Sequence, residues 1–81
     1  MKELFLATKR LALSESGFVF DPVSGQSFTV NETGLVILRL TQHEEDFEVV
    51  VAQLAEQFDA SLVEIKRDAQ DFINRLKGFL K

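Results

Sequence analysis

The spacing of apolar residues divides the chain into two parts. Between residues 9 and 30, apolar and polar residues alternate in short runs, as they do in antiparallel strands. Three pairs of apolar residues with matching parity mark these runs: Leu11 with Leu13, Phe18 with Phe20, and Phe28 with Val30. From Asn31 onward, apolar residues recur every three or four positions, which is the period of an amphipathic helix. The pattern predicts three strands followed by three helices.

Residues that favour turns separate the predicted strands. The run Asp21-Pro22-Val23-Ser24-Gly25 contains a proline, which fixes φ, and a glycine, which permits a positive φ. It predicts a hairpin turn that leads into a third strand at residues 26–30. Residues 14–17, which end in a glycine, predict the earlier turn.

Each predicted helix begins at a residue whose side chain can accept a hydrogen bond from a free backbone N–H of the first turn. These residues are Asn31, Asp46 and Ser61, and Ser61 with Glu64 forms the Ser-x-x-Glu pattern of a capping box. We expect the helices at about residues 32–42, 47–58 and 62–78, with Gly78 ending the third. The apolar stripe of the third helix consists of Ile65, Ala69, Phe72 and Leu76.

A length of 81 residues fits one small domain that spans residues 1–81. Its expected fold class is α+β and winged-helix-like, with a three-stranded antiparallel sheet followed by three helices. In so short a chain the free energy from burial barely exceeds the entropy lost on folding, so a partner would stabilise it. Together with the apolar residues 4–6, this predicts a monomer in equilibrium with a weak or strand-exchanged dimer.

The composition excludes most kinds of chemistry. There is no cysteine, so disulfides, thiol nucleophiles and thiolate metal sites are excluded, and the single His43 cannot build an imidazole cluster. No nucleophile-and-base set and no glycine-rich phosphate loop can be assembled. We therefore expect no enzymatic activity, no metal and no cofactor. No run is apolar enough for a signal peptide or a membrane span, so we expect a cytoplasmic protein without membrane contact.

The charge distribution bears on nucleic-acid binding. The second and third predicted helices have the spacing of a helix-turn-helix, which raises a DNA-binding hypothesis. Residues 44–59, which contain the second helix, carry six carboxylates and no basic residue, a net charge of −6. In a DNA-bound helix-turn-helix the first of the two helices crosses the phosphate backbone, which this charge would repel. The carboxylates are interpreted as the solvated start of a helix, where the helix dipole favours anions.

The third predicted helix has two unlike flanks beside its apolar stripe. One flank carries Glu64, Asp68, Asp71 and Arg75, with Asp71 and Arg75 spaced as an i,i+4 ion pair. The other flank carries Leu62, Lys66, Ile73, Lys77 and Leu80. This mixture of aliphatic and basic groups suits an amphipathic, partly acidic peptide, or it is a wider core edge whose lysines extend to solvent. Beside this helix, the strand at 26–30 would form a sheet edge able to pair with an added strand.

Two runs of the sequence, GFVFDPVSGQSFTVNETGLVILRL and LAEQFDASLVEIKRDAQDFINRL, resemble the PqqD family of pyrroloquinoline quinone (PQQ) biosynthesis, the family behind the RiPP precursor peptide recognition element. The matching features are the Phe-rich hairpin, the start of the first helix at residues 30–33, the end of the second at residues 54–58, and Asp68, Phe72 and Leu76 in the third. The segment at residues 41–45 lacks the glycine usual in this family's turn between the first two helices.

The resemblance implies a peptide-binding chaperone without chemistry of its own. It would capture the leader of a ribosomally synthesised precursor peptide by strand addition and present it to a modifying enzyme of the radical SAM type, in PQQ or other RiPP biosynthesis. The implied peptide-binding residues are Gln26, Ser27, Phe28, Thr29, Val30, Lys66, Ile73 and Lys77. Two alternatives stay open: a winged helix-turn-helix DNA-binding or transcriptional accessory protein, and an interaction domain for an unrelated partner.

Overall fold

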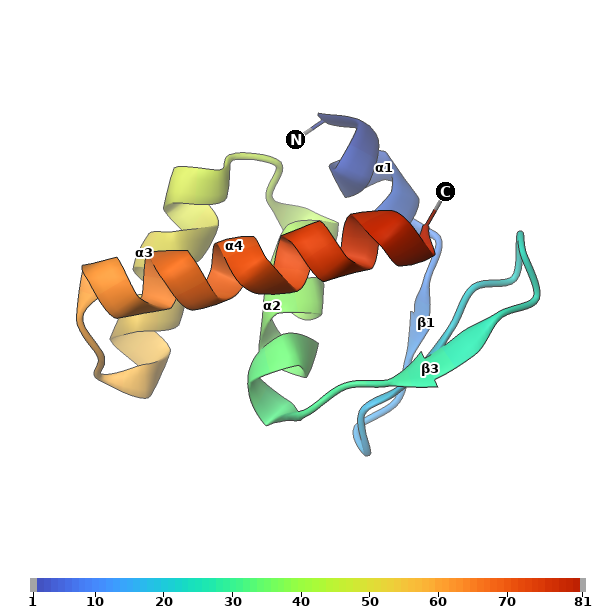
Figure 1. Ribbon diagram of the computed structural model, residues 1–81, viewed down its shortest axis with the longest axis horizontal. Coiled ribbons are helices and arrows are strands. Elements are labelled where there is room, and N and C mark those ends of the chain that lie inside the picture. Colours follow the sequence, from blue (N-terminus) through green and yellow to red (C-terminus); the bar gives the residue numbers. More distant parts are fainter. Residues whose placement is uncertain (1, 81) are drawn as a thin grey trace.

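The computed structural model describes residues 2–80, which form four helices and one three-stranded sheet (Figure 1). In chain order the elements are α1 (Lys2–Lys9), β1 (Ala12–Leu13), β2 (Phe18–Phe20), β3 (Ser27–Thr29), α2 (Glu32–His43), α3 (Phe47–Phe58) and α4 (Leu62–Phe79). The α+β class, with an antiparallel sheet followed by three helices, is confirmed. The term winged-helix-like fits only loosely, since a further helix precedes the sheet.

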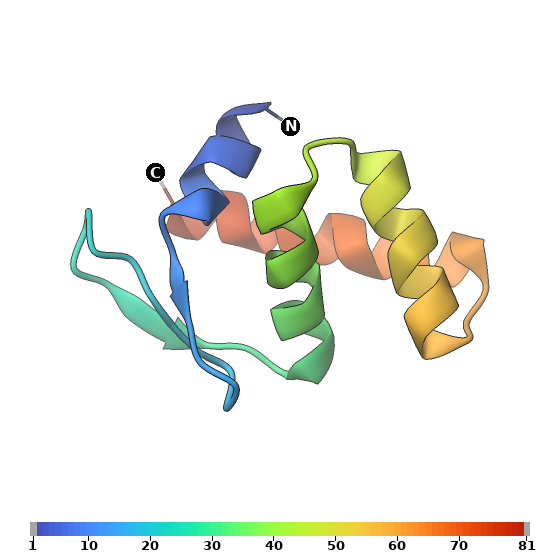
Figure 2. The same ribbon diagram turned by 180° about the vertical axis from the view of Figure 1, so that it is seen from behind.

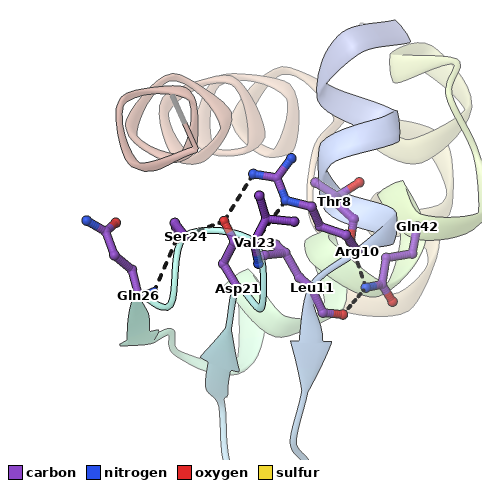
Figure 3. A network of polar contacts seen from close by, with 8 residues as sticks. All are labelled: Thr8, Arg10, Leu11, Asp21, Val23, Ser24, Gln26 and Gln42. Carbon is purple, nitrogen blue, oxygen red and sulfur yellow. Dashed lines mark hydrogen bonds and ion pairs between the residues drawn. The ribbon is translucent and has the colours of Figure 1, made fainter.

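That further helix, α1, was not predicted, and the expected start of the strands at residue 9 is wrong because Lys9 is its last residue. Leu4 and Thr8, four residues apart, form its buried face, whereas Leu6 is 58% exposed. At its end, the Gln42 side-chain amide of α2 donates to the Thr8 and Leu11 carbonyl oxygens at 2.9 and 3.0 Å (Figure 3). Two turns of helix are too short for a 3.6-residue period to stand out in the sequence.

The sheet has the order β1-β2-β3, and both neighbouring pairs are antiparallel. On the central strand, Val19 faces the core and is fully buried. Phe18 and Phe20 share the opposite face, as their matching parity predicts, and they are 46% and 38% exposed. One face of the sheet therefore carries two aromatic rings in contact with solvent.

Both predicted turns are confirmed. The Gly17 N–H donates to the Ser14 carbonyl oxygen at 3.1 Å, and the Gly25 N–H donates to the Asp21 carbonyl oxygen at 2.8 Å. Both glycines have a positive φ, +91° at Gly17 and +77° at Gly25, which a residue without a Cβ adopts at little cost.

All three predicted N-caps are also confirmed. Asn31, Asp46 and Ser61 accept backbone N–H groups of their own helices at 2.8, 3.0 and 3.2 Å. The predicted end of the third helix is wrong, because α4 continues through Gly78 to Phe79. Gly78 is not among the described residues with a positive φ, so it does not end the helix in a left-handed conformation.

Helix α4 joins two hydrophobic clusters into one core. Its N-terminal half supplies Ile65 and Ala69 to a cluster with α2 and α3, and its C-terminal half supplies Ile73 and Leu76 to a cluster with α1, β2, α2 and the segment that leads into β1. Figure 1 shows α4 lying across α2 and α3 with its C-terminal end beside α1 and the sheet, and Figure 2 shows α2 between the sheet and α3. The C-terminal half of α4 is thereby fixed next to β3.

Candidate functional site

Strand β3 lies at an edge of the sheet, and its register determines which of its backbone groups face outward. The Val30 N–H donates to the Gly17 carbonyl oxygen, and the Asp21 N–H donates to the Gln26 carbonyl oxygen, both at 2.8 Å. Because hydrogen-bonded and non-hydrogen-bonded pairs alternate in an antiparallel ladder, the pair of Val19 and Phe28 between them is also hydrogen-bonded.

Ser27 and Thr29 therefore direct their N–H and C=O groups away from β2. No other strand among the described residues pairs with β3 on that side. The sequence alone left this parity open, since either set of alternate residues could have faced outward.

A groove runs between this open edge and α4. Its central pocket, about 320 Å³ in volume, is lined by Phe28, Thr29, Val30, Asn31, Phe72, Arg75, Leu76 and Phe79. A hollow at one end is lined by Ser24, Gln26, Ser27, Gly78 and Phe79. A hollow at the other end is lined by Asn31, Thr33, Gly34, Ile37, Asp68, Asp71, Phe72 and Arg75. The central pocket shares Phe79 with the first hollow and Asn31, Phe72 and Arg75 with the second. The three neighbouring hollows together are here named the β3–α4 groove.

The length of the groove suits a short extended peptide. Its α4 wall runs from Asp68 to Phe79, which is about 16 Å of helix at about 1.5 Å per residue. A strand covers that length in about five residues.

Three aromatic side chains shape the interior of the β3–α4 groove. The rings of Phe28 and Phe79 have centroids 4.1 Å apart with their planes at 47°. Phe72 packs against the first turn of α2, where a Cβ on Gly34 would lie only 2.8 Å from the ring. A glycine at position 34 thus allows the Phe72 ring to lie close to α2.

The structure brings together only part of the residue set expected from the sequence. Gln26, Ser27, Phe28, Thr29 and Val30 all line the β3–α4 groove. Lys66 does not, and its Nζ lies 2.8 Å from Glu48 Oε1 of α3. Lys77 is exposed and is not among the groove residues.

The expectation that Ile73 lies on an exposed flank is wrong. Ile73 is 1% exposed and belongs to the core, whereas Phe72 is half-buried and lines the groove. Both are apolar and adjacent, so the sequence did not show which of them faces inward. The flank of α4 that lines the groove is instead the one with Asp68, Asp71 and Arg75. The predicted ion pair between Asp71 and Arg75 is not among those that the described side chains form.

A buried carboxylate holds the hairpin that leads into β3. The Arg10 guanidinium donates through Nε and Nη2 to the two carboxylate oxygens of Asp21, each at 3.0 Å (Figure 3). Asp21 is 1% exposed and also accepts the Val23 N–H and the Ser24 hydroxyl. The Arg10 hydrogen bonds hold the pKa of Asp21 well below its usual range. Sequence reasoning missed this pair, because an aspartate in a turn gives no sign of a distant partner.

Two kinds of site do not form among the described residues. No helix within residues 2–80 has the length and apolar character that crossing a membrane requires. No three His, Asp or Glu side chains of that part of the chain gather closely enough to hold a metal ion.

Comparison with known proteins matches the chain to a protein-family model. The family model described as "Coenzyme PQQ synthesis protein D (PqqD)" matches residues 17–78, a range that includes β2, β3, α2, α3 and nearly all of α4. No curated protein and no solved structure matches the chain. Because the family match covers well over half of the 81 residues and includes most of the β3–α4 groove, the chain belongs to the PqqD family of coenzyme PQQ synthesis proteins.

Proposed function

We propose that this protein binds an extended segment of a precursor peptide by strand addition to β3 and presents it to a modifying enzyme, without catalysing a reaction itself. The observation that carries the proposal is the open edge of β3, where Ser27 and Thr29 direct their backbone groups into the β3–α4 groove rather than toward β2. Unpaired edge groups beside apolar pockets are the two elements of strand-addition recognition.

The edge of β3 and the apolar pockets would make different contributions to peptide binding. The N–H and C=O groups of Ser27 and Thr29 would pair with the peptide backbone, which supplies affinity regardless of sequence. Every second peptide side chain would enter the groove, where Phe28, Phe72 and Phe79 offer apolar surface. Burial of that surface adds affinity and selects apolar side chains.

Membership of the PqqD family supports a role in the quinone pathway. The resemblance noted in the sequence extends this to the leader of a ribosomally made precursor as the bound segment. It also extends it to a radical SAM protein as the enzyme that receives the peptide, in the cytoplasm. These finer assignments are part of the proposal.

A selection experiment tests the proposal with peptides of random sequence. A display library of random decapeptides is selected on the immobilised protein, and binders are synthesised and titrated into ¹⁵N-labelled protein. We expect saturable binding and slower hydrogen exchange at the Ser27 and Thr29 amides, because these amides gain acceptors. Failure to enrich any peptide, or binders that leave both amides unchanged, would overturn strand addition.

Duplex DNA serves as the comparison ligand. A protein that binds DNA through phosphate contacts loses affinity steeply as salt is added. Saturable, salt-sensitive binding of duplex DNA that shifts α4 resonances would favour the nucleic-acid alternative instead.

A further inference from the structure

One cation stands out in the β3–α4 groove. Of the eight residues that line the central pocket, only Arg75 carries a charge. The ion pairs among the described side chains are Arg10 with Asp21 and Lys66 with Glu48, so neither involves Arg75. Arg75 also makes none of the described side-chain hydrogen bonds, although Asp71 lies one helical turn away on the same helix. The groove thus holds a guanidinium without a partner among the described residues.

Asp68 and Asp71 line the adjoining hollow with Arg75, but on the side of the central pocket the surroundings of Arg75 are uncharged and favour a carboxylate of the peptide as its partner. Guanidinium and carboxylate groups form paired, charge-assisted hydrogen bonds that are stronger than those between neutral groups. The apolar walls formed by Val30, Phe72 and Leu76 would exclude water from such a pair once a peptide fills the groove. Electrostatic attraction increases as water is excluded.

The register of β3 determines where that carboxylate would lie in the peptide. In an antiparallel pair, directly opposed residues direct their side chains to the same face. Peptide residues opposite Phe28 and Val30 would therefore face α4, and these two peptide residues are two positions apart. The first would lie at the end of the pocket formed by Phe28 and Phe79, and the second would lie at the end formed by Val30, Asn31 and Arg75.

We propose that this protein selects peptides with an acidic residue two positions away from an apolar residue, with Arg75 binding the carboxylate and Phe28 and Phe79 contacting the apolar side chain. The inference rests on the proposed function, since it assumes that the peptide adds to β3. It specifies the class of peptide and names Arg75 as the residue that determines the charge preference.

The decapeptide selection, repeated on two variants, tests this inference. Arg75→Glu reverses the charge in the groove, and Arg67→Glu makes the same change on the same helix at an exposed position outside the groove. We expect peptides enriched on the wild type and on Arg67→Glu to share an acid two positions from an apolar residue. Peptides enriched on Arg75→Glu should carry lysine or arginine in place of the acid.

A double-mutant cycle measures the contact directly. Replacing the acid of one selected peptide by its amide should lower affinity for the wild type about fivefold to tenfold, as expected for one partly exposed charge-assisted hydrogen bond. The same replacement should leave affinity for Arg75→Gln unchanged. Circular dichroism and urea unfolding of each variant establish that the fold is retained.

The results of these experiments distinguish a failure of the Arg75 charge preference from a failure of strand addition to β3. Selected peptides that protect the Ser27 and Thr29 amides but show no acidic preference, or an acidic preference that persists on Arg75→Glu, would overturn the role of Arg75 and leave strand addition standing. Failure to enrich any peptide on any of the three proteins would overturn strand addition, and this inference with it.

Discussion

The carbonyl oxygen of Val30 occupies the space into which a side chain on residue 17 would project. Gly17 has a φ of +91°, and a Cβ built on it would overlap the Val30 carbonyl. The same two residues are joined by the hydrogen bond from the Val30 N–H to the Gly17 carbonyl oxygen at 2.8 Å. This close approach holds the end of β3 against the first turn of the sheet, at the point where the chain enters α2.

Replacing Gly17 by alanine should therefore destabilise the protein strongly. We expect Gly17→Ala to lower the free energy of unfolding by about 2–3 kcal/mol, because the variant combines an unfavourable φ with a steric overlap against backbone. Gly25→Ala is the matched control, since Gly25 also has a positive φ but a Cβ there would meet no atom within 4 Å. It should cost about 1 kcal/mol. Equal losses in urea unfolding would contradict the role of the Val30 contact.

The open edge of β3 predicts opposite effects of N-methylation at neighbouring residues. A methyl group on the Thr29 nitrogen points out of the sheet, so it should leave urea stability almost unchanged and weaken binding of a selected peptide at least about tenfold. A methyl group on the Phe28 nitrogen points at β2 and removes a ladder hydrogen bond. It should lower the free energy of unfolding by at least about 1 kcal/mol. The assigned register is wrong if the two methylated proteins, made by chemical synthesis, show the reverse pattern.

The stretches of the fold that could be predicted are those determined by local chemistry. The caps at Asn31, Asp46 and Ser61 and the two glycine turns each depend on a few neighbouring residues, which the sequence shows directly. The parts that were missed depend on distant residues. The two turns of α1 depend on packing against α2, and Arg10 meets Asp21 only once the hairpin has formed.

The candidate site also has one half that the sequence predicts and one half that it does not. The β3 half of the groove was predicted, since the edge strand follows from the order of strands and helices. The α4 half was assigned to the wrong flank, because Phe72 and Ile73 are adjacent and both apolar. A rotation of about 100° about the helix axis, the angle between consecutive residues, changes which flank borders β3.

Phe79 should contribute to peptide binding more than to stability. It is 40% exposed, ends α4, and contacts Phe28 at the end of the central pocket. We expect Phe79→Ala to weaken binding of a selected peptide about tenfold through lost apolar contact. The free energy of unfolding should fall by only about 1–2 kcal/mol, from the loss of one aromatic pair and of the burial of a partly exposed ring.

Two variants control the Phe79 experiment. Phe79→Leu should retain most of the affinity because it keeps apolar volume at the same place. Val63→Ala removes an apolar side chain that is 76% exposed near the other end of α4, and it should change neither quantity. Unaltered affinity of Phe79→Ala in fluorescence titrations would show that the peptide does not reach this end of the groove.

The ion pair of Arg10 and Asp21 should make stability depend on pH in the acid range. Its hydrogen bonds hold the Asp21 pKa below the usual value of about 4, so the unfolded chain takes up a proton at a higher pH than the folded protein does. The stabilisation is fully present above about pH 4 and declines as the pH falls below that value.

The variant Asp21→Asn removes this titration. It should be less stable than the wild type at about pH 7 and lose less stability between about pH 4 and about pH 2.5, as measured by urea unfolding at several pH values. Asp68→Asn changes an exposed carboxylate that forms none of the described ion pairs, and it should retain the wild-type decline. A wild-type decline in Asp21→Asn as well would assign the acid sensitivity to other carboxylates.

The exposed face of the sheet gives strand addition a second consequence. Phe18 and Phe20 point away from α4, and in an extended sheet the peptide residues opposite Ser27 and Thr29 would point the same way. This protein would then contact one set of alternate peptide side chains in the groove, and the other set would lie exposed next to two aromatic rings. In a precursor peptide bound in this way, one set of alternate residues would determine binding to this protein and the other set would remain accessible to the modifying enzyme. Substitutions in one set would then leave recognition through the other set unchanged.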